Sequence, residues 1–157
     1  MLYANPYNSY CEGFYFSSLD EYNDLSEKHP CEEFEVMFID GDNPKLFASA
    51  QISQGNLETW FDNLEHISDD DDKAIQLGYL LVDIGYKLDD AIERSDEVCL
   101  FHGSASDYAE ELFGDCYDIP QHLIHYIDYE KIARDLEIEG AISEFSYRIY
   151  ITNSNEF

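Results

Sequence analysis

Basic residues are scarce in this sequence. Its 157 residues include 8 Lys and Arg against 35 Asp and Glu, so the formal net charge at pH 7 is -27. A protein that binds nucleic acid or an anionic membrane needs a local basic patch, and the sequence has none. The deficit therefore excludes both as partners and makes a basic protein surface the natural partner.

Cysteine pairs and long apolar runs are also missing. The four cysteines form no CxxC motif, and the amino terminus lacks the basic and apolar segments of a secretory signal. We therefore expect reduced thiols, no structural disulfide and a cytoplasmic protein. The best apolar run, Ala74 to Val82, is about half of the roughly 20 residues that a membrane span needs. The cysteines are Cys11, Cys31, Cys99 and Cys116.

The motifs of common catalytic and metal sites are absent as well. No GxSxG, HExxH, P-loop or GxGxxG segment occurs. His122 and His125 are three residues apart, but no second pair of ligands matches them, and Cys116 near His122 is a weaker pair still. The acidic segments that begin at Asp40 and Asp69 lack residues that an EF-hand loop requires. We therefore expect no enzyme, no cofactor and no specific metal site.

Apolar residues are nevertheless plentiful. Hydrophobic residues make up 45% of the chain and aromatic residues 15%, which is enough for a packed core despite the charge. Alternating apolar residues predict strands in the first and last thirds, and a 3.6-residue period predicts only helices in the middle. The sequence therefore predicts an α+β fold, an elongated chain of three small domains packed end to end. Their predicted bounds are 1–53 (α+β), 54–95 (all-α) and 96–157 (α+β).

The same patterns, with capping and turn residues, predict the individual elements. Strands are expected at 2–4, 13–16, 33–39, 98–101 and 145–151, the last as a strand pair or hairpin, and a loop at 40–44. Helices are expected at 18–25, 57–64, 69–85, 88–94, 104–114, 120–126 and 128–136.

Carboxylates are densest in the last third of the chain. Between Asp107 and Glu144 there are eleven, opposed only by Lys131 and Arg134. After Ser104 they repeat at three- and four-residue spacing, so like charges share one helix face at a cost of roughly 0.2–0.5 kcal/mol a pair. Oppositely charged pairs at this spacing would stabilise the helix instead. A sequence that repeatedly places like charges together at such cost indicates that the charges have a function.

The size of the charge can be compared with that of DNA. At one charge per about 1.7 Å of duplex, 27 net charges equal on the order of 45 Å of DNA, and a dimer carries about twice that. The acidity is also compatible with a halophilic protein, or with acidic first helix turns that complement the helix dipole, as for Asp69 to Asp72. The acidic surface predicted to stand in for DNA comprises Asp69, Asp70, Asp71, Asp72, Asp83, Asp89, Asp90, Glu93, Asp107, Glu110, Glu111, Asp115, Asp118, Asp128, Glu130, Asp135, Glu137 and Glu139.

Nine segments are spread over nearly the whole chain: 2–8, 13–16, 33–36, 38–42, 88–91, 107–113, 119–120, 126–130 and 133–136. They resemble segments of the ArdA antirestriction family. The resemblance implies three small domains, dimerisation through the carboxy-terminal part, and a curved acidic copy of bent duplex DNA. It also implies that the protein binds the DNA-recognition and methyltransferase subunits of Type I restriction–modification enzymes in a bacterial host. The antirestriction motif would lie at about 113–140.

Apolar residues inside the most acidic region predict a dimer interface. They are more numerous than short helices need for their own core, and acids surround them as a polar rim would. The alternative function is an acidic interaction module that sequesters another basic DNA-binding protein, such as a nucleoid protein. The predicted interface residues are Phe113, Tyr117, Ile119, Leu123, Tyr126, Ile127 and Tyr129.

Overall fold

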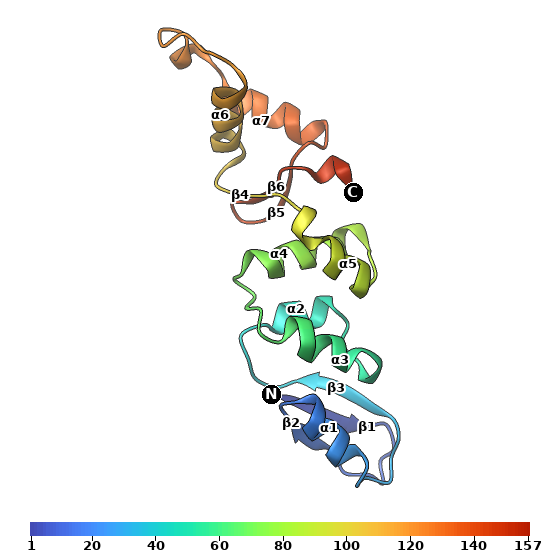
Figure 1. The fold of residues 1–157 in the computed structure, drawn as a ribbon. Coiled ribbons are helices and arrows are strands. Elements are labelled where there is room, and N and C mark those ends of the chain that lie inside the picture. Colours follow the sequence, from blue (N-terminus) through green and yellow to red (C-terminus); the bar gives the residue numbers. More distant parts are fainter. The chain divides into compact units, whose positions relative to one another are not determined.

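The computed structural model describes residues 1–157 and has a mixed α+β architecture. Helices account for 48% of the residues and strands for 15%, in two small sheets, which confirms the predicted fold class. The chain divides into two compact units, Met1–Leu88 and Asp89–Phe157 (Figure 1). The finer division into three domains stays a prediction.

The amino-terminal unit begins with a three-stranded sheet. The strands are β1 (Leu2–Pro6), β2 (Phe14–Phe16) and β3 (Phe34–Phe38), and β1 lies in the centre, antiparallel to both neighbours. Buried residues alternate with more exposed ones along the strands, as the alternating sequence predicts. The two edge strands are joined by α1 (Leu19–Ser26), whose Tyr22 packs against Phe14 and Phe16 of the buried face.

Helix α1 begins one residue after the predicted start at residue 18, and Ser18 is its N-cap. The Ser18 hydroxyl accepts the Glu21 N–H at 3.1 Å, and the Glu21 carboxylate accepts the Ser17 N–H at 2.8 Å. One unpaired N–H of the first helical turn, that of Glu21, and the Ser17 N–H just before the helix are therefore satisfied by side chains. The return bond reaches Ser17, one residue before the N-cap, where a standard capping box would reach Ser18 itself.

The rest of this unit is helical. Helix α3 (Leu57–Thr59) and helix α4 (Asp72–Gly78) each continue into a π-helical turn, at Trp60–Leu64 and Tyr79–Ile84. Their apolar sides form the core, in which Trp60 is 1% exposed. A further helix, α2 (Pro44–Ser49), follows the loop predicted at 40–44 and has no counterpart among the predicted elements.

The expectation of four free thiols is wrong for Cys11 and Cys31, which form a disulfide with a Cα–Cα separation of 6.4 Å. Cys11 lies in the β1–β2 loop and Cys31 just before β3. Because β1 is antiparallel to both strands, these two loops meet at the same end of the sheet. A separation of 20 residues carried no sign of this in the sequence. Cys99 and Cys116 are free and exposed.

The carboxy-terminal unit combines a second small sheet with a helix pair. It contains α5 (Leu88–Arg94), β4 (Leu100–His102), α6 (Ala105–Cys116), α7 (Tyr129–Ile138), β5 (Ser143–Ser146) and β6 (Ile149–Ile151). The antiparallel order is β4-β6-β5, and α6 packs against α7.

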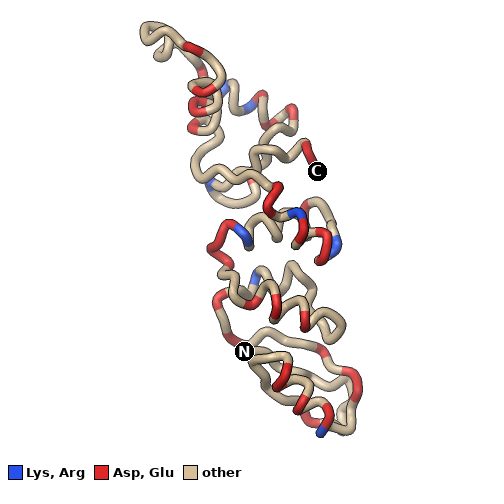
Figure 2. The backbone as a smooth tube through the Cα atoms, in the orientation of Figure 1, with Lys and Arg blue, Asp and Glu red and all other residues tan.

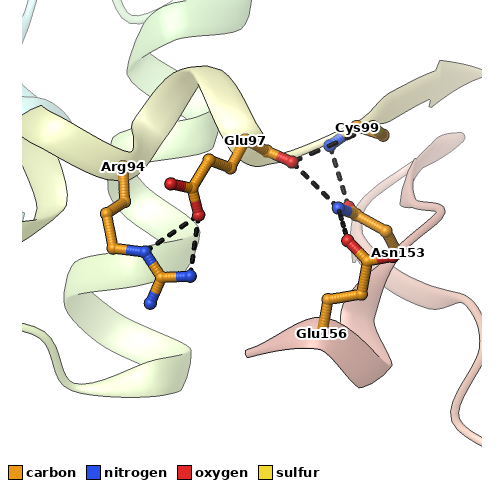
Figure 3. Close-up of polar contacts among 5 residues, drawn as sticks. All are labelled: Arg94, Glu97, Cys99, Asn153 and Glu156. Carbon is orange, nitrogen blue, oxygen red and sulfur yellow. Dashed lines mark hydrogen bonds and ion pairs between the residues drawn. The ribbon is translucent and has the colours of Figure 1, made fainter.

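Asn153 fastens the segment that leads from α5 into this sheet (Figure 3). Its amide nitrogen donates to the Glu97 carbonyl at 2.8 Å and to the Glu156 carboxylate at 2.9 Å, and its amide oxygen accepts the Cys99 N–H at 2.9 Å. Arg94 pairs with the Glu97 carboxylate at 2.7 Å. One side chain therefore ties the start of β4 to the end of the chain.

The helix predicted at 120–126 is wrong. Only Ile124–Tyr126 forms a short 3-10 turn there, because the Leu123 and Tyr126 N–H groups bond three residues back, to Pro120 and Leu123. Helix α6 also runs two residues past the predicted end at Gly114. Gly114 does not have the positive φ of a glycine cap, so it continues the helix. None of the helices is both long and apolar enough to cross a membrane.

Candidate protein-binding surface

The carboxylates of this protein lie on its surface. Of the 35 Asp and Glu residues, 34 are exposed, and Asp69 alone is partly buried. Figure 2 shows carboxylates on the helices of both units, with few basic residues between them. All but one of the predicted acidic residues are therefore open to a partner.

Helix α6 carries the most regular group of carboxylates. Its N-cap Ser104 accepts the Asp107 N–H at 3.1 Å, and from there the exposed acids follow at helical spacing, while Ala109 on the opposite side is buried. At 1.5 Å rise per residue, the stripe spans about 12 Å, or one charge per ~4 Å. One DNA strand carries one charge per about 3.4 Å. The α6 stripe comprises Asp107, Glu110, Glu111 and Asp115.

Asp107 differs from the rest of the α6 stripe. Hydrogen bonds from the side chain and backbone of Ser104, and then the Arg148 guanidinium at 3.2 Å, lower its pKa below the ordinary 3.8. The Ser104 N–H donates to its carboxylate at 2.9 Å. Asp107 is therefore charged at neutral pH, but it also holds the start of α6 and the β5–β6 hairpin.

The acids of α7 also include one that holds the start of the helix and others that are only exposed. Asp128 is the N-cap, and its carboxylate accepts the Lys131 N–H at 3.0 Å. Burial raises the pKa of the nearby Tyr150 hydroxyl, and Glu144 and Glu137 raise it further. The exposed acids of this helix and its end are Glu130, Asp135, Glu137 and Glu139.

The run from Asp69 to Asp72 is divided between two helices. The Asp69 carboxylate accepts the Lys45 and Leu46 N–H groups at 2.9 and 2.8 Å, so it caps the start of α2. Asp71 is the N-cap of α4 and accepts the Ser68 N–H at 2.9 Å, and Asp72 lies in the first turn. Acidic residues at helix starts complement the helix dipole, so the needs of the fold account for part of this run.

The predicted set leaves out the acidic residues of the first third of the chain. Ten carboxylates lie there and all are exposed, with only Lys28 and Lys45 among them. They occur singly or in pairs, so no cluster marks them in the sequence. They are Glu12, Asp20, Glu21, Asp24, Glu27, Glu32, Glu33, Glu35, Asp40 and Asp42.

The predicted dimer residues all lie outside the core. Tyr117, Leu123 and Tyr126 are 61%, 45% and 85% exposed, and the other four are half-buried. The Phe113 and Tyr117 rings contact each other at 5.1 Å between centroids. A hollow of about 290 Å³ lies beside them, lined by Glu110, Gly114, Tyr117, Asp118, Ile119, Ile124 and Tyr129. These side chains are available for an interface.

The described side chains include no group of three His, Cys, Asp or Glu residues placed to hold a metal ion. His122 and His125 are both exposed.

Fold and surface together define a small acidic α+β protein whose carboxylates are exposed. A family model described as Antirestriction protein (ArdA) matches residues 7–150. The chain therefore belongs to the ArdA antirestriction family, as the resemblance predicted, and this is not an enzyme family. Neither the comparison with curated proteins nor the comparison with solved structures finds a match.

Proposed function

We propose that this protein is an acidic mimic of bent duplex DNA that occupies the DNA-binding groove of a Type I restriction–modification enzyme. It would act in the bacterial cytoplasm, on the DNA-recognition and methyltransferase subunits, and inhibit restriction and, through the same groove, methylation, without a cofactor or catalysis. The observation that carries the proposal is the exposure of 34 of 35 carboxylates in a member of an antirestriction family.

The physical basis is exchange of one polyanion for another. A DNA-binding groove presents Lys and Arg side chains, and counterions are released when these side chains neutralise DNA phosphates. Carboxylates at a similar spacing would give the same release. The α6 stripe has about that spacing, one charge per ~4 Å against about 3.4 Å in a DNA strand. With so few basic residues of its own, the protein neutralises little of this charge internally.

The proposal includes assembly. Three small domains, 1–53, 54–95 and 96–157, would carry the carboxylates in series, and two copies would join through Phe113, Tyr117, Ile119, Leu123, Tyr126, Ile127 and Tyr129. A dimer would double the length of DNA that the charge can represent. Apolar burial at that contact would offset repulsion between the two acidic copies.

Competition with duplex DNA tests the proposal. Purified protein at micromolar concentration should displace a labelled duplex from a Type I restriction–modification complex and stop cleavage. If restriction and methylation both continue at large molar excess of the protein, the proposal is wrong.

Charge variants test whether the carboxylates act together. Glu111→Gln should weaken binding less than about threefold, whereas Glu110→Gln/Glu111→Gln/Asp115→Asn should reduce the slope of log affinity against log salt by about 3. The control Glu110→Asp/Glu111→Asp/Asp115→Glu keeps the charge and should keep the slope. A single exposed neutralisation that abolished binding in a folded protein would indicate a discrete site instead.

A further inference from the structure

One face of the amino-terminal sheet is apolar but not covered. The side chains of β1, β2 and β3 that face α1 are buried: Leu2 is 2% exposed, Phe16 1% and Phe34 3%. Residues at the alternate positions lie on the other face. We call the apolar part of this face, formed by Met1, Tyr3, Tyr15, Met37 and Ile39, the outer sheet face. Asn5 and Glu35, joined by a hydrogen bond at 3.3 Å, lie on the same side at its end.

The outer sheet face is unusually apolar for a solvated surface. A sheet with one buried face normally presents polar residues on the other. Here Met1 is 50% exposed, Tyr15 57%, Met37 41% and Ile39 46%. In a chain with 27% charged residues, such a group of apolar side chains at one place indicates an interaction site.

The side chains form an ordered row across the sheet. Tyr3 on the central strand pairs in register with Tyr15 on one side and Met37 on the other. The Tyr3 and Tyr15 ring centroids are 4.7 Å apart. Gly13 lies under the Tyr3 ring, where an added Cβ would collide with the ring and with the Ala4 carbonyl. The row is therefore held in place before any partner binds.

The charge around the row decides what kind of partner fits. Glu33 directly precedes the edge strand β3, Glu35 lies near its start, and Asp40 lies two residues after its end; all three are exposed. Residues 1–53 hold ten carboxylates and only two basic residues. A basic surface would gain from these charges, whereas a second copy would first have to offset their repulsion, as at the proposed dimer contact, so the charges favour a basic partner.

We infer that the outer sheet face is a separate apolar contact with the basic DNA-binding protein that the carboxylates engage. It would dock on an apolar patch that Lys or Arg side chains border. The inference rests on the proposed function and deepens it. A mimic of DNA phosphates alone would bind through charge, whereas this face adds an apolar contact that phosphates do not offer. It makes part of the affinity independent of salt, since apolar burial does not release counterions.

The test compares two uncharged double variants in the DNA-competition assay with the Type I complex. Tyr15→Thr/Met37→Thr removes the exposed row with residues that suit a strand, and should bind about tenfold more weakly with the salt slope unchanged. The control Tyr10→Thr/Val82→Thr alters two exposed apolar residues off this face, 96% and 62% exposed, and should bind like wild type. Should the first double variant not fold by circular dichroism, Met37→Gln alone should give about a threefold loss.

The outcomes separate this inference from the proposed function. If wild type competes with DNA and the sheet-face variant competes equally well, the inference is overturned and the proposed function stands. If wild type does not compete at all, both fail. If sedimentation shows that the sheet-face variant loses self-association, the face joins two copies and the inference is overturned.

Discussion

Asp69 and Asp70 are neighbours in the sequence with different physical roles. The Asp69 carboxylate accepts two backbone N–H groups at the start of α2, whereas Asp70 is exposed and lies one residue before the N-cap of α4. In an acidic protein, individual carboxylates can thus serve the fold or the surface. Only hydrogen-bond geometry separates the two classes.

Substitution of these two aspartates should therefore have unequal effects. Asp69→Ala removes the acceptor for the Lys45 and Leu46 N–H groups and should lower the free energy of unfolding by about 1 kcal/mol. Asp70→Ala, the matched control, should change it by less than about 0.5 kcal/mol. Urea unfolding measures both. Equal losses would mean that Asp69 does not cap α2.

Asp107 predicts a pH dependence of stability. Because its pKa is lowered in the folded state by Ser104 and Arg148, the carboxylate stabilises the fold above the ordinary pKa of 3.8. This contribution is lost as the pH falls through the folded pKa. Asp107→Asn should therefore be less stable than wild type at pH 7, with a smaller difference at pH 3.

Urea unfolding at both pH values measures this effect. Asp135→Asn, at an exposed carboxylate of α7, is the control for a general effect of removing one charge. A difference between wild type and Asp107→Asn that grew toward pH 3 would contradict the assignment.

At the scale of elements, patterns in the sequence located most strands and helices. Helix α5 has the predicted bounds of 88–94, and α1 and α6 begin within one residue of their predicted starts at 18 and 104. These signals are local. The sequence could predict them because each lies within one turn of helix or one strand.

The features that the sequence did not reveal depend on contacts between distant segments. Helix α2 is short, and its start is capped by Asp69, more than twenty residues away. The Cys11–Cys31 disulfide depends on the strand order of the sheet. Segment 120–126 begins with Pro120, which a helix tolerates in its first turn, but its Leu123 and Tyr126 side chains are exposed, so no packing supports a helix there.

Two glycines should respond in opposite ways to alanine. Gly85 ends the π-helical turn after α4 with φ +82°, a left-handed conformation that costs an alanine about 1–2 kcal/mol. Gly114 lies inside α6 with no atom near an added Cβ, so alanine there should stabilise the helix by about 0.5–1 kcal/mol. Urea unfolding monitored by circular dichroism measures the change in the free energy of unfolding for both variants. Destabilisation by Gly114→Ala would mean that α6 ends at residue 114 after all.

At the scale of the whole molecule, composition predicted the surface better than it predicted any site. Charges are almost never buried without a partner, so 35 carboxylates in a small chain had to lie outside its core. Which of them contact a partner cannot be deduced in this way, because nearly all are exposed. The extent of the predicted acidic surface therefore stays a prediction, as does the dimer interface.

Assembly and target binding should have opposite salt dependence. Self-association of two acidic copies should tighten as salt screens their repulsion, whereas binding to a basic target should weaken. Tyr126→Asp should give a folded monomer in sedimentation at micromolar concentration. Tyr147→Asp is the matched control, because both tyrosines are 85% exposed but Tyr147 lies outside the predicted interface. A monomeric wild type at moderate salt would contradict the predicted dimer.

The near-complete exposure of the carboxylates has a consequence for how this protein can change. The core contains none of them, so an acid can be lost at one surface position and regained at another with little effect on packing. Such a pair of substitutions keeps the net charge and shifts one charge by a few ångströms. The proposed electrostatic image of DNA would then be a collective property that many different surface sequences can hold in common. A partner that selects for that image would constrain the sum of the charges and their approximate spacing, and would leave the acidic residues that do not cap a helix free to drift.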